Sequence, residues 1–235
     1  MNVIKKITLI AITLLLIVFA IAFGGTLLYE KEITKVALDN FNKNLKKPIQ
    51  TSEVNFSILK KFPFASIELN NLIILDVTQK DTLLTAEKFY LKLNIIDLFK
   101  KVYNFKLIEI KNGSLNIILD ENGKENYLIF EGKSEKNNFD LQNIIIENTS
   151  IIYQNKLEKI RFKTYSKNTK LKGDFTNDLD LIIKGSLVNS IVFFNDNQTS
   201  INTNHIVNFL VKNKKSLLKL TGFISENDLK INFDA

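Results

Sequence analysis

The sequence has no cysteine, which excludes disulfide bonds, thiolate metal sites and a cysteine nucleophile. It has no tryptophan, two prolines and one histidine, His205, so a histidine-based metal site or a catalytic triad lacks its parts. Glycine-rich phosphate-binding motifs and the nucleophile-elbow motif are also missing. From these absences we expect a protein that is not an enzyme, with no catalytic residue, no bound cofactor and no metal site.

Carboxylates occur mostly singly, which leaves few candidates for acid–base pairs or cation ligands. The closest groupings are Asp120–Glu121 and Asp178 with Asp180. The first lies at a predicted hairpin turn, where aspartate accepts backbone hydrogen bonds, and the second flanks the start of a strand. We interpret both groupings as structural.

The charge balance is moderately basic, with 32 lysine and arginine residues against 25 acidic residues and a net charge of +7. Arg161 is the only arginine, and the lysines are spread along the sequence. Nucleic-acid surfaces usually gather arginine and lysine together with aromatic side chains, so we predict no nucleic-acid partner. Weak attraction to anionic lipid headgroups is compatible with this charge, and so is an ordinary solvated surface.

A charge-free apolar run extends from Ile7 to Leu28. At about 1.5 Å per residue, a helix of this length reaches roughly 33 Å, enough to cross a hydrocarbon core of about 30 Å. The run therefore predicts a single-pass transmembrane anchor within a first segment of residues 1–29. Representative anchor residues are Ile7, Leu15, Phe19 and Leu28.

The charges on either side of this run predict its orientation. Lys5 and Lys6 precede it, whereas the flank that follows, Glu30–Glu32, is nearly neutral. The positive-inside rule then places the N-terminus in the cytoplasm and the rest of the chain across the membrane. A cleavable signal peptide ending at Ala20–Ala22 is the alternative, but the apolar run continues beyond that site, so we favour a retained anchor.

Residues 30–47 show an amphipathic helix pattern. Ile33, Ala37, Phe41 and Leu45 recur at intervals of four residues, with charged and polar residues between them. Pro48 ends the pattern, because proline has no N–H group and disfavours a helical residue before it. The helix could lie on a membrane surface or cover the end of a β-sheet core. We favour the second position because its polar face mixes charges of both signs.

Residues 48–235 are predicted to form strand after strand, with one face apolar and the other polar. Alternation slips at Asn70–Asn71, which suggests a bulge, and one short helix is expected at Ile96–Tyr103. Asn122–Gly123 marks a hairpin turn. Alternating runs include Val54–Ile58, Ile67–Leu69, Phe89–Ile95, Ile108–Ile110, Leu115–Leu119, Ile160–Phe162, Leu179–Ile183, Val207–Val211, Leu218–Leu220 and Leu229–Phe233.

The sequence predicts almost no helix to cover so large an apolar sheet face. Such a sheet must close on itself, pack against another sheet or curl around something apolar. The fold class that we predict is therefore mainly β: the anchor, the short amphipathic helix and then a long antiparallel sheet. Because alternation continues up to Phe233, we expect that the domain is truncated at its C-terminus or that its last strand is an edge.

The first 130 residues or so resemble the N-terminal region of the AsmA family of bacterial inner-membrane-anchored periplasmic proteins. The layout is similar: a basic start, one span, a helix and then strands with a particular order of short motifs. The motifs that carry the resemblance are Phe62–Pro63, Ser66–Leu72, Asp76, Leu83–Glu87, Leu91–Asn94, Asp97–Phe99, Leu107–Leu115 and the spaced residues Asp120, Gly123 and Asn126.

This resemblance implies a curled, taco-like sheet related to repeating β-groove lipid-transfer proteins, with an apolar inner face. It implies a role in outer-membrane biogenesis, through phospholipid binding or transport, and effects on protein targeting to the membrane. The body would lie in the periplasm, with the bacterial inner membrane, phospholipid and other envelope proteins as partners. The residues that we expect to line the lipid are Phe89, Leu91, Leu93, Ile108, Ile110, Leu115, Ile117 and Leu119.

A second function stays open at this point. If the sheet closes on itself, the protein would be a non-catalytic scaffold that recruits other envelope proteins through a sheet edge. Residue types cannot decide between the two, because a closed core and a lipid-binding surface both require apolar side chains. Whether the apolar face is open is therefore the structural question.

Overall fold

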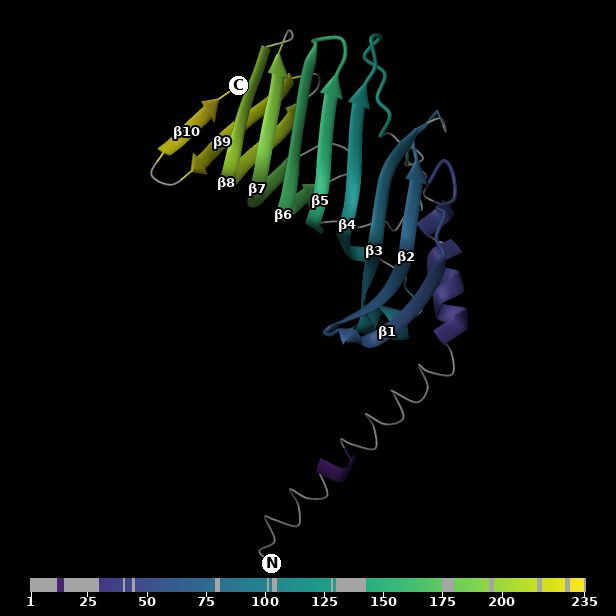
Figure 1. Cartoon of the computed structure of the whole chain (residues 1–235). Coiled ribbons are helices and arrows are strands. Elements are labelled where there is room, and N and C mark those ends of the chain that lie inside the picture. The colour runs from purple at the N-terminus through teal and green to yellow at the C-terminus, as the bar shows by residue number, and fades with distance from the viewer. Residues whose placement is uncertain are drawn as a thin grey trace, which may run out of the picture.

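The structure, a computed structural model of the whole chain, consists mainly of one large β-sheet (Figure 1). Most of the predicted anchor, including Ile7, Leu15, Phe19 and Leu28, lies outside the residues that the structure describes. Within the described part, no helix is long and apolar enough to span a bilayer. The described residues are 12–14, 30–39, 41–43, 45–78, 81–100, 102, 105–127, 129, 143–174, 180–194, 197–214, 217–226 and 229–234.

Within the described residues, ten strands lie side by side in chain order, so each strand pairs with its neighbour in the sequence. A short helix, α2 (Ile95–Phe99), follows β3 and overlaps the region Ile96–Tyr103, where we predicted a helical interruption. The strands are β1 (Glu53–Lys61), β2 (Phe64–Leu75), β3 (Thr82–Asn94), β4 (Phe105–Leu119), β5 (Asn143–Asn155), β6 (Ile160–Asp174), β7 (Asp180–Phe194), β8 (Asn197–Lys214), β9 (Leu217–Glu226) and β10 (Leu229–Asp234).

The prediction of an antiparallel sheet is wrong at one pair of strands. β4 and β5 run parallel, with Leu107 opposite Asn143 and Leu119 opposite Asn155, so the sheet is mixed. A parallel pair needs a long connection to return the chain to its starting level, and residues 120–142 provide it. Alternation of apolar residues is the same for both strand directions and could not reveal this. The sheet is also open, because β1 and β10 are its two ends.

The amphipathic helix covers the β1–β4 end of the sheet, as we favoured from its sequence. Residues 30–39 and 41–43 are helical, and we call them the N-terminal helix. Ala37, Phe41 and Leu45 are buried in the main hydrophobic core. The ring of Phe41 lies 6.3 Å from that of Phe89 and meets the ring of Phe105 edge-on at 5.6 Å. We call the side of the sheet that this helix covers the apolar face, and the opposite side the polar face.

A line of left-handed asparagines crosses the sheet where the alternation slips. Asn71, Asn112 and Asn148 have φ angles of 50°, 53° and 46°, a conformation that asparagine tolerates better than most residues. Asn112 and Asn148 occupy the same level of β4 and β5, between the pairs 111–147 and 113–149. Each strand therefore switches its alternation at a shared level, and the apolar face continues across the line.

The predicted bulge at Asn70–Asn71 proves to be such a switch. Asn70 pairs with Lys88 and Leu72 with Ala86, so both strands skip one residue and their register is preserved. On β4 the switch also demands glycine. A Cβ atom on Gly113 would lie 2.0 Å from the carbonyl oxygen of Thr85, far inside van der Waals contact.

We predict that Phe41→Ala destabilises the full-length chain by about 3–5 kcal/mol, because it empties a buried position between two aromatic rings. Phe62→Ala is the matched control, since that side chain is 69% exposed. Urea unfolding followed by circular dichroism measures both. If the two variants unfold at the same urea concentration, the N-terminal helix does not belong to the core.

Candidate functional site

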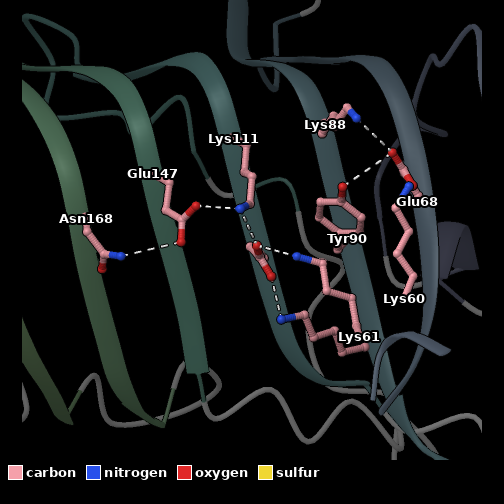
Figure 2. Close-up of polar contacts among 10 residues, drawn as sticks. Lys60, Lys61, Glu68, Lys88, Tyr90, Lys111, Glu147 and Asn168 are labelled. Carbon is pink, nitrogen blue, oxygen red and sulfur yellow. Dashed lines mark hydrogen bonds and ion pairs between the residues drawn. The ribbon is translucent and has the colours of Figure 1, made fainter. Parts of the chain in front are cut away.

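The polar face of β2–β5 carries a network of charged side chains that bridges the strands (Figure 2). On β2, Glu68 is buried and pairs with Lys60 from β1 and, at 3.5 Å, with Lys88 from β3. The hydroxyl group of Tyr90 donates a hydrogen bond of 3.3 Å to the same carboxylate. The register explains this grouping, because Tyr90 stands directly opposite Glu68 on the neighbouring strand.

Glu109 is the centre of the network, and its carboxylate contacts three lysines. Lys61 donates to it at 2.8 Å and Lys111 at 3.0 Å, while Lys92 completes the set from β3. Lys61 comes from β1, where the register with β2 shifts between Ser57 and Lys61. Its ammonium nitrogen also lies 4.2 Å from the centre of the Tyr90 ring, within cation–π range.

The network continues to β5 and β6. Lys111 bridges Glu109 to Glu147 on β5 through a contact of 2.6 Å, and Asn168 on β6 donates to Glu147 at 3.4 Å. Five lysines thus surround three glutamates on this face. The strands are therefore joined by ion pairs as well as by their backbone hydrogen bonds.

These contacts shift the ionisation of the groups. Burial by itself would raise the pKa of Glu109, but hydrogen bonds from Lys61, Lys92 and Lys111 outweigh it and lower the pKa to about 2. For Glu68, burial is likewise opposed by Lys60, and the pKa of this carboxyl falls below its usual value. Burial raises the pKa of the Tyr90 phenol. Near neutral pH the carboxylates are charged and the phenol is not.

Chemically, this arrangement holds charges in place. The Glu109 carboxylate is occupied by three ammonium groups, which suits an electrostatic joint between strands better than an acid–base catalyst. Over the described residues, no group of three or more histidine, cysteine or acidic side chains is close enough to bind a metal. Alternation placed Tyr90 and Lys92 on the polar face, where we expected contact with water, whereas both are buried. The ammonium groups of Lys60 and Lys61 lie over the Tyr90 ring, and Lys92 contacts Glu109.

The spaced residues Asp120, Gly123 and Asn126 form a turn that protects one edge of β4. The Asp120 carboxylate accepts hydrogen bonds of 2.8 Å from the backbone N–H groups of Asn122 and Lys124, and Gly123 takes a positive φ of 74°. Asp120 is thus a structural turn residue, as we interpreted it. Its neighbour Glu121 is exposed.

Asn126 then substitutes for a strand beside β4. Its side-chain oxygen accepts from the N–H of Ile118 at 2.8 Å, and its amide donates to the carbonyl of Asn116 at 2.9 Å. β3 begins at Thr82, whose carbonyl accepts a hydrogen bond from the Asn116 side chain. β4 continues to Leu119 and therefore extends past the start of β3. The buried Asn126 amide therefore supplies the backbone partners that a longer β3 would have given.

The residues predicted to line a lipid divide into two groups. One group is buried in the core beneath the N-terminal helix, with exposures of 0–6%: Phe89, Leu91, Leu93, Ile108 and Ile110. The other is half-buried on β4: Leu115, Ile117 and Leu119. Any lipid contact in the structure as it stands is therefore restricted to the second group and its neighbours, and the lipid-binding role of either group stays a prediction.

The chain matches no known protein-family model, and no curated protein matches its sequence. The resemblance to the AsmA family consequently stays a prediction drawn from the motifs. What the structure adds is a physical role for some of them. Asp120 and Gly123 make the turn, and Asn126 protects the edge of β4.

We predict that Glu109 contributes stability that acid removes. Its pKa falls from about 4.5 to about 2 on folding, so its contribution is complete above about pH 4.5 and is lost as the pH falls towards 2. Glu109→Gln should therefore lower the urea midpoint at neutral pH and flatten its decline between these values. Glu121→Gln, at an exposed turn position, is the control. Parallel pH profiles for Glu109→Gln and the unmodified protein would contradict this role.

We predict that Asn126→Asp costs about 1–3 kcal/mol of stability, because a carboxylate cannot donate to the Asn116 carbonyl and removes the hydrogen bond to that partly buried acceptor. Asn122→Asp makes the same chemical change at an exposed position of the same turn. Chemical denaturation of both variants measures the difference. Equal stability would show that the Asn126 amide is not needed at the β4 edge.

Proposed function

We propose that this protein is an AsmA-type, membrane-anchored envelope protein that binds phospholipid acyl chains on the apolar face of its sheet. It would act in outer-membrane biogenesis by binding or transferring phospholipid, and would thereby affect protein targeting to the membrane. The proposal joins the apolar run Ile7–Leu28, the motifs of residues 1–130 and the open sheet.

The observation that carries the proposal is an apolar face that extends beyond its helix. Ile117 on β4, Tyr153 on β5 and Phe162 on β6 stand side by side in register and are only half-buried. Leu115 and Ile151 form a second such row and contact the core. Partly exposed apolar rows of this kind gain free energy when an apolar ligand covers them, at about 25 cal/mol per Å².

The buried core sets one limit of the proposed site. Phe41 already packs against Phe89 and Phe105, so an acyl chain would have to displace the N-terminal helix to reach them. The site that we propose therefore begins at Leu115 and follows β4–β6 away from the helix. A continuous apolar row would provide affinity without selecting one lipid species, because burial of hydrocarbon is non-directional.

The alternative function, a scaffold for other envelope proteins, was predicted for a sheet closed on itself, and the described sheet is open; its strand edges are the observation that still supports recruitment of a partner. β1 and β10 each have a neighbour on one side only, and an unpaired strand edge can accept a strand from another chain. In that case the apolar rows would be covered by protein. The two functions predict different molecules in contact with Ile117.

Photocrosslinking separates these functions. We would place p-benzoylphenylalanine at Ile117 or at Ile118 in the full-length chain, irradiate cells and identify the adducts by mass spectrometry. Both positions are half-buried and adjacent, but neighbouring residues of a strand point to opposite faces of the sheet. The proposal predicts phospholipid adducts at position 117 and few or none at position 118.

Adducts with protein at position 117, without lipid, would support the scaffold instead. Equal lipid labelling at both positions would show general contact with membrane lipid and would contradict a lipid site on the apolar face. Unchanged urea midpoints of the two substituted chains serve as the folding control.

A further inference from the structure

The polar face of β6 holds a concentration of positive charge that the ion-pair network does not neutralise. Over the thirteen residues from Ile160 to Lys172 the sequence has no acidic residue. It includes five cations, all exposed, and a sixth stands on β7. We call this set the basic stripe: Arg161, Lys163, Lys167, Lys170, Lys172 and Lys184.

Register places five of the six members of the stripe on one side of the sheet; Lys167 is the residue that the pairing skips between Ser166 and Asn168. Lys170 lies directly opposite Lys184 on β7, and on its other side it faces Ile145 of β5, which in turn faces Glu109. These five cations are therefore on the same face as Glu109 and opposite the apolar rows. From Arg161 to Lys172 a strand extends roughly 36 Å at about 3.3 Å per residue, so the stripe is long and linear.

The stripe differs from the network beside it because no described side chain forms an ion pair with its cations. Among the residues that the structure describes, none of its six members forms an ion pair with a carboxylate. The nearest acidic residue on the neighbouring strand, Glu147, already contacts Lys111 and Asn168. Directly opposed like charges such as Lys170 and Lys184 destabilise a sheet, so their presence without acidic partners points to a function.

Apolar side chains are exposed among these cations. Ile182, which pairs with Lys172, is 40% exposed, and Ile206, two strands from Asn168 on the same row, is 57% exposed. Tyr165 is 39% exposed between Lys163 and Lys167. Cations mixed with exposed apolar and aromatic side chains are typical of surfaces that meet a lipid bilayer at its headgroup level.

We propose that the basic stripe docks the polar face of β6–β7 onto a phospholipid bilayer that carries anionic headgroups. The ammonium and guanidinium groups would contact the phosphates, and Ile182, Ile206 and Tyr165 would enter the region beneath them. The stripe and Ile117 lie on opposite faces, so bilayer docking and acyl-chain binding can be lost separately. Docking would turn the polar side of this region towards the bilayer and leave the apolar rows facing away from it.

A linear polyanion such as single-stranded nucleic acid is the competing ligand. It would need aromatic platforms that stack on successive bases. Tyr165 is the one exposed aromatic residue that we find along the described part of the stripe; Phe193, opposite Arg161, is half-buried, with the guanidinium group 5.8 Å from its ring centre. Exposed isoleucines have no role in binding a phosphate backbone, whereas a bilayer accommodates them. The observations therefore favour the bilayer.

Lysine footprinting tests the proposal on the full-length chain. The protein is reconstituted into vesicles of phosphatidylcholine alone, or of phosphatidylcholine with phosphatidylglycerol, and external lysines are acetylated and quantified by mass spectrometry. We expect Lys163, Lys170, Lys172 and Lys184 to react several-fold more slowly in the anionic vesicles, with the protection lost at high salt. Lys100, Lys124 and Lys156, which are exposed elsewhere, should react equally in both.

Two triple variants that remove the same number of charges provide a second test. Lys163→Gln, Lys170→Gln and Lys172→Gln together should abolish the protection of Lys184. Each cation near an anionic surface contributes about fivefold, so three should shift docking on the order of 100-fold. Lys100→Gln, Lys124→Gln and Lys156→Gln remove the same charge and should leave Lys184 protected. All substituted positions are exposed, and unchanged urea midpoints would confirm folding.

Two outcomes would overturn the proposal. The first is equal labelling of the stripe lysines in neutral and anionic vesicles. The second is protection of these lysines by an oligothymidylate in neutral vesicles without any protection by phosphatidylglycerol, which would assign the stripe to a linear polyanion. Loss of lipid adducts at Ile117 with the footprint intact would contradict the acyl-chain proposal alone.

Discussion

The constraint on which the rest of the structure depends is the need to cover one apolar face of an open sheet. An apolar face of this size cannot stay in water, and its burial provides most of the folding free energy. At the β2–β4 end the chain covers that face itself, through Phe41 and its neighbours on the N-terminal helix. Farther along, rows such as Ile117, Tyr153 and Phe162 are only half covered. The same physical requirement thus produces a core at one end and a candidate binding surface at the other.

On the polar face, the charged groups around Glu109 form ion pairs, whereas no ion pair is described for the cations of the basic stripe. Around Glu109, the cost of burying a carboxylate is offset by three lysines, and removing the acid would leave these cations facing one another. From Ile160 to Lys172 on β6 no acidic residue is present, and the five cations of that stretch are exposed. One region of the polar face therefore stabilises the sheet, while the other is available to an anionic partner.

The left-handed asparagines keep the apolar and polar faces continuous along the strands. Side chains along a strand alternate with a period of two, so one extra residue reverses which residues point to the apolar face. Asn71, Asn112 and Asn148 are the extra residues of their strands and lie at a shared level, so both faces of the sheet continue across that level. Gly113 allows the strands to approach where a Cβ atom would collide with Thr85.

Sequence by itself determined the local pattern: a mainly β chain, the helix that contains Phe41, the slip at Asn71 and the turn at Asp120. These follow from periodicity and from the backbone preferences of individual residues, which are local properties. Tertiary structure decided what depends on register. It joined Glu109 to lysines from three strands, made β4 and β5 parallel, and placed Phe89 beneath the helix while Ile117 stays half-exposed. It also placed Arg161, Lys163, Lys170 and Lys172 on one face of the sheet and set Lys184 of β7 opposite Lys170.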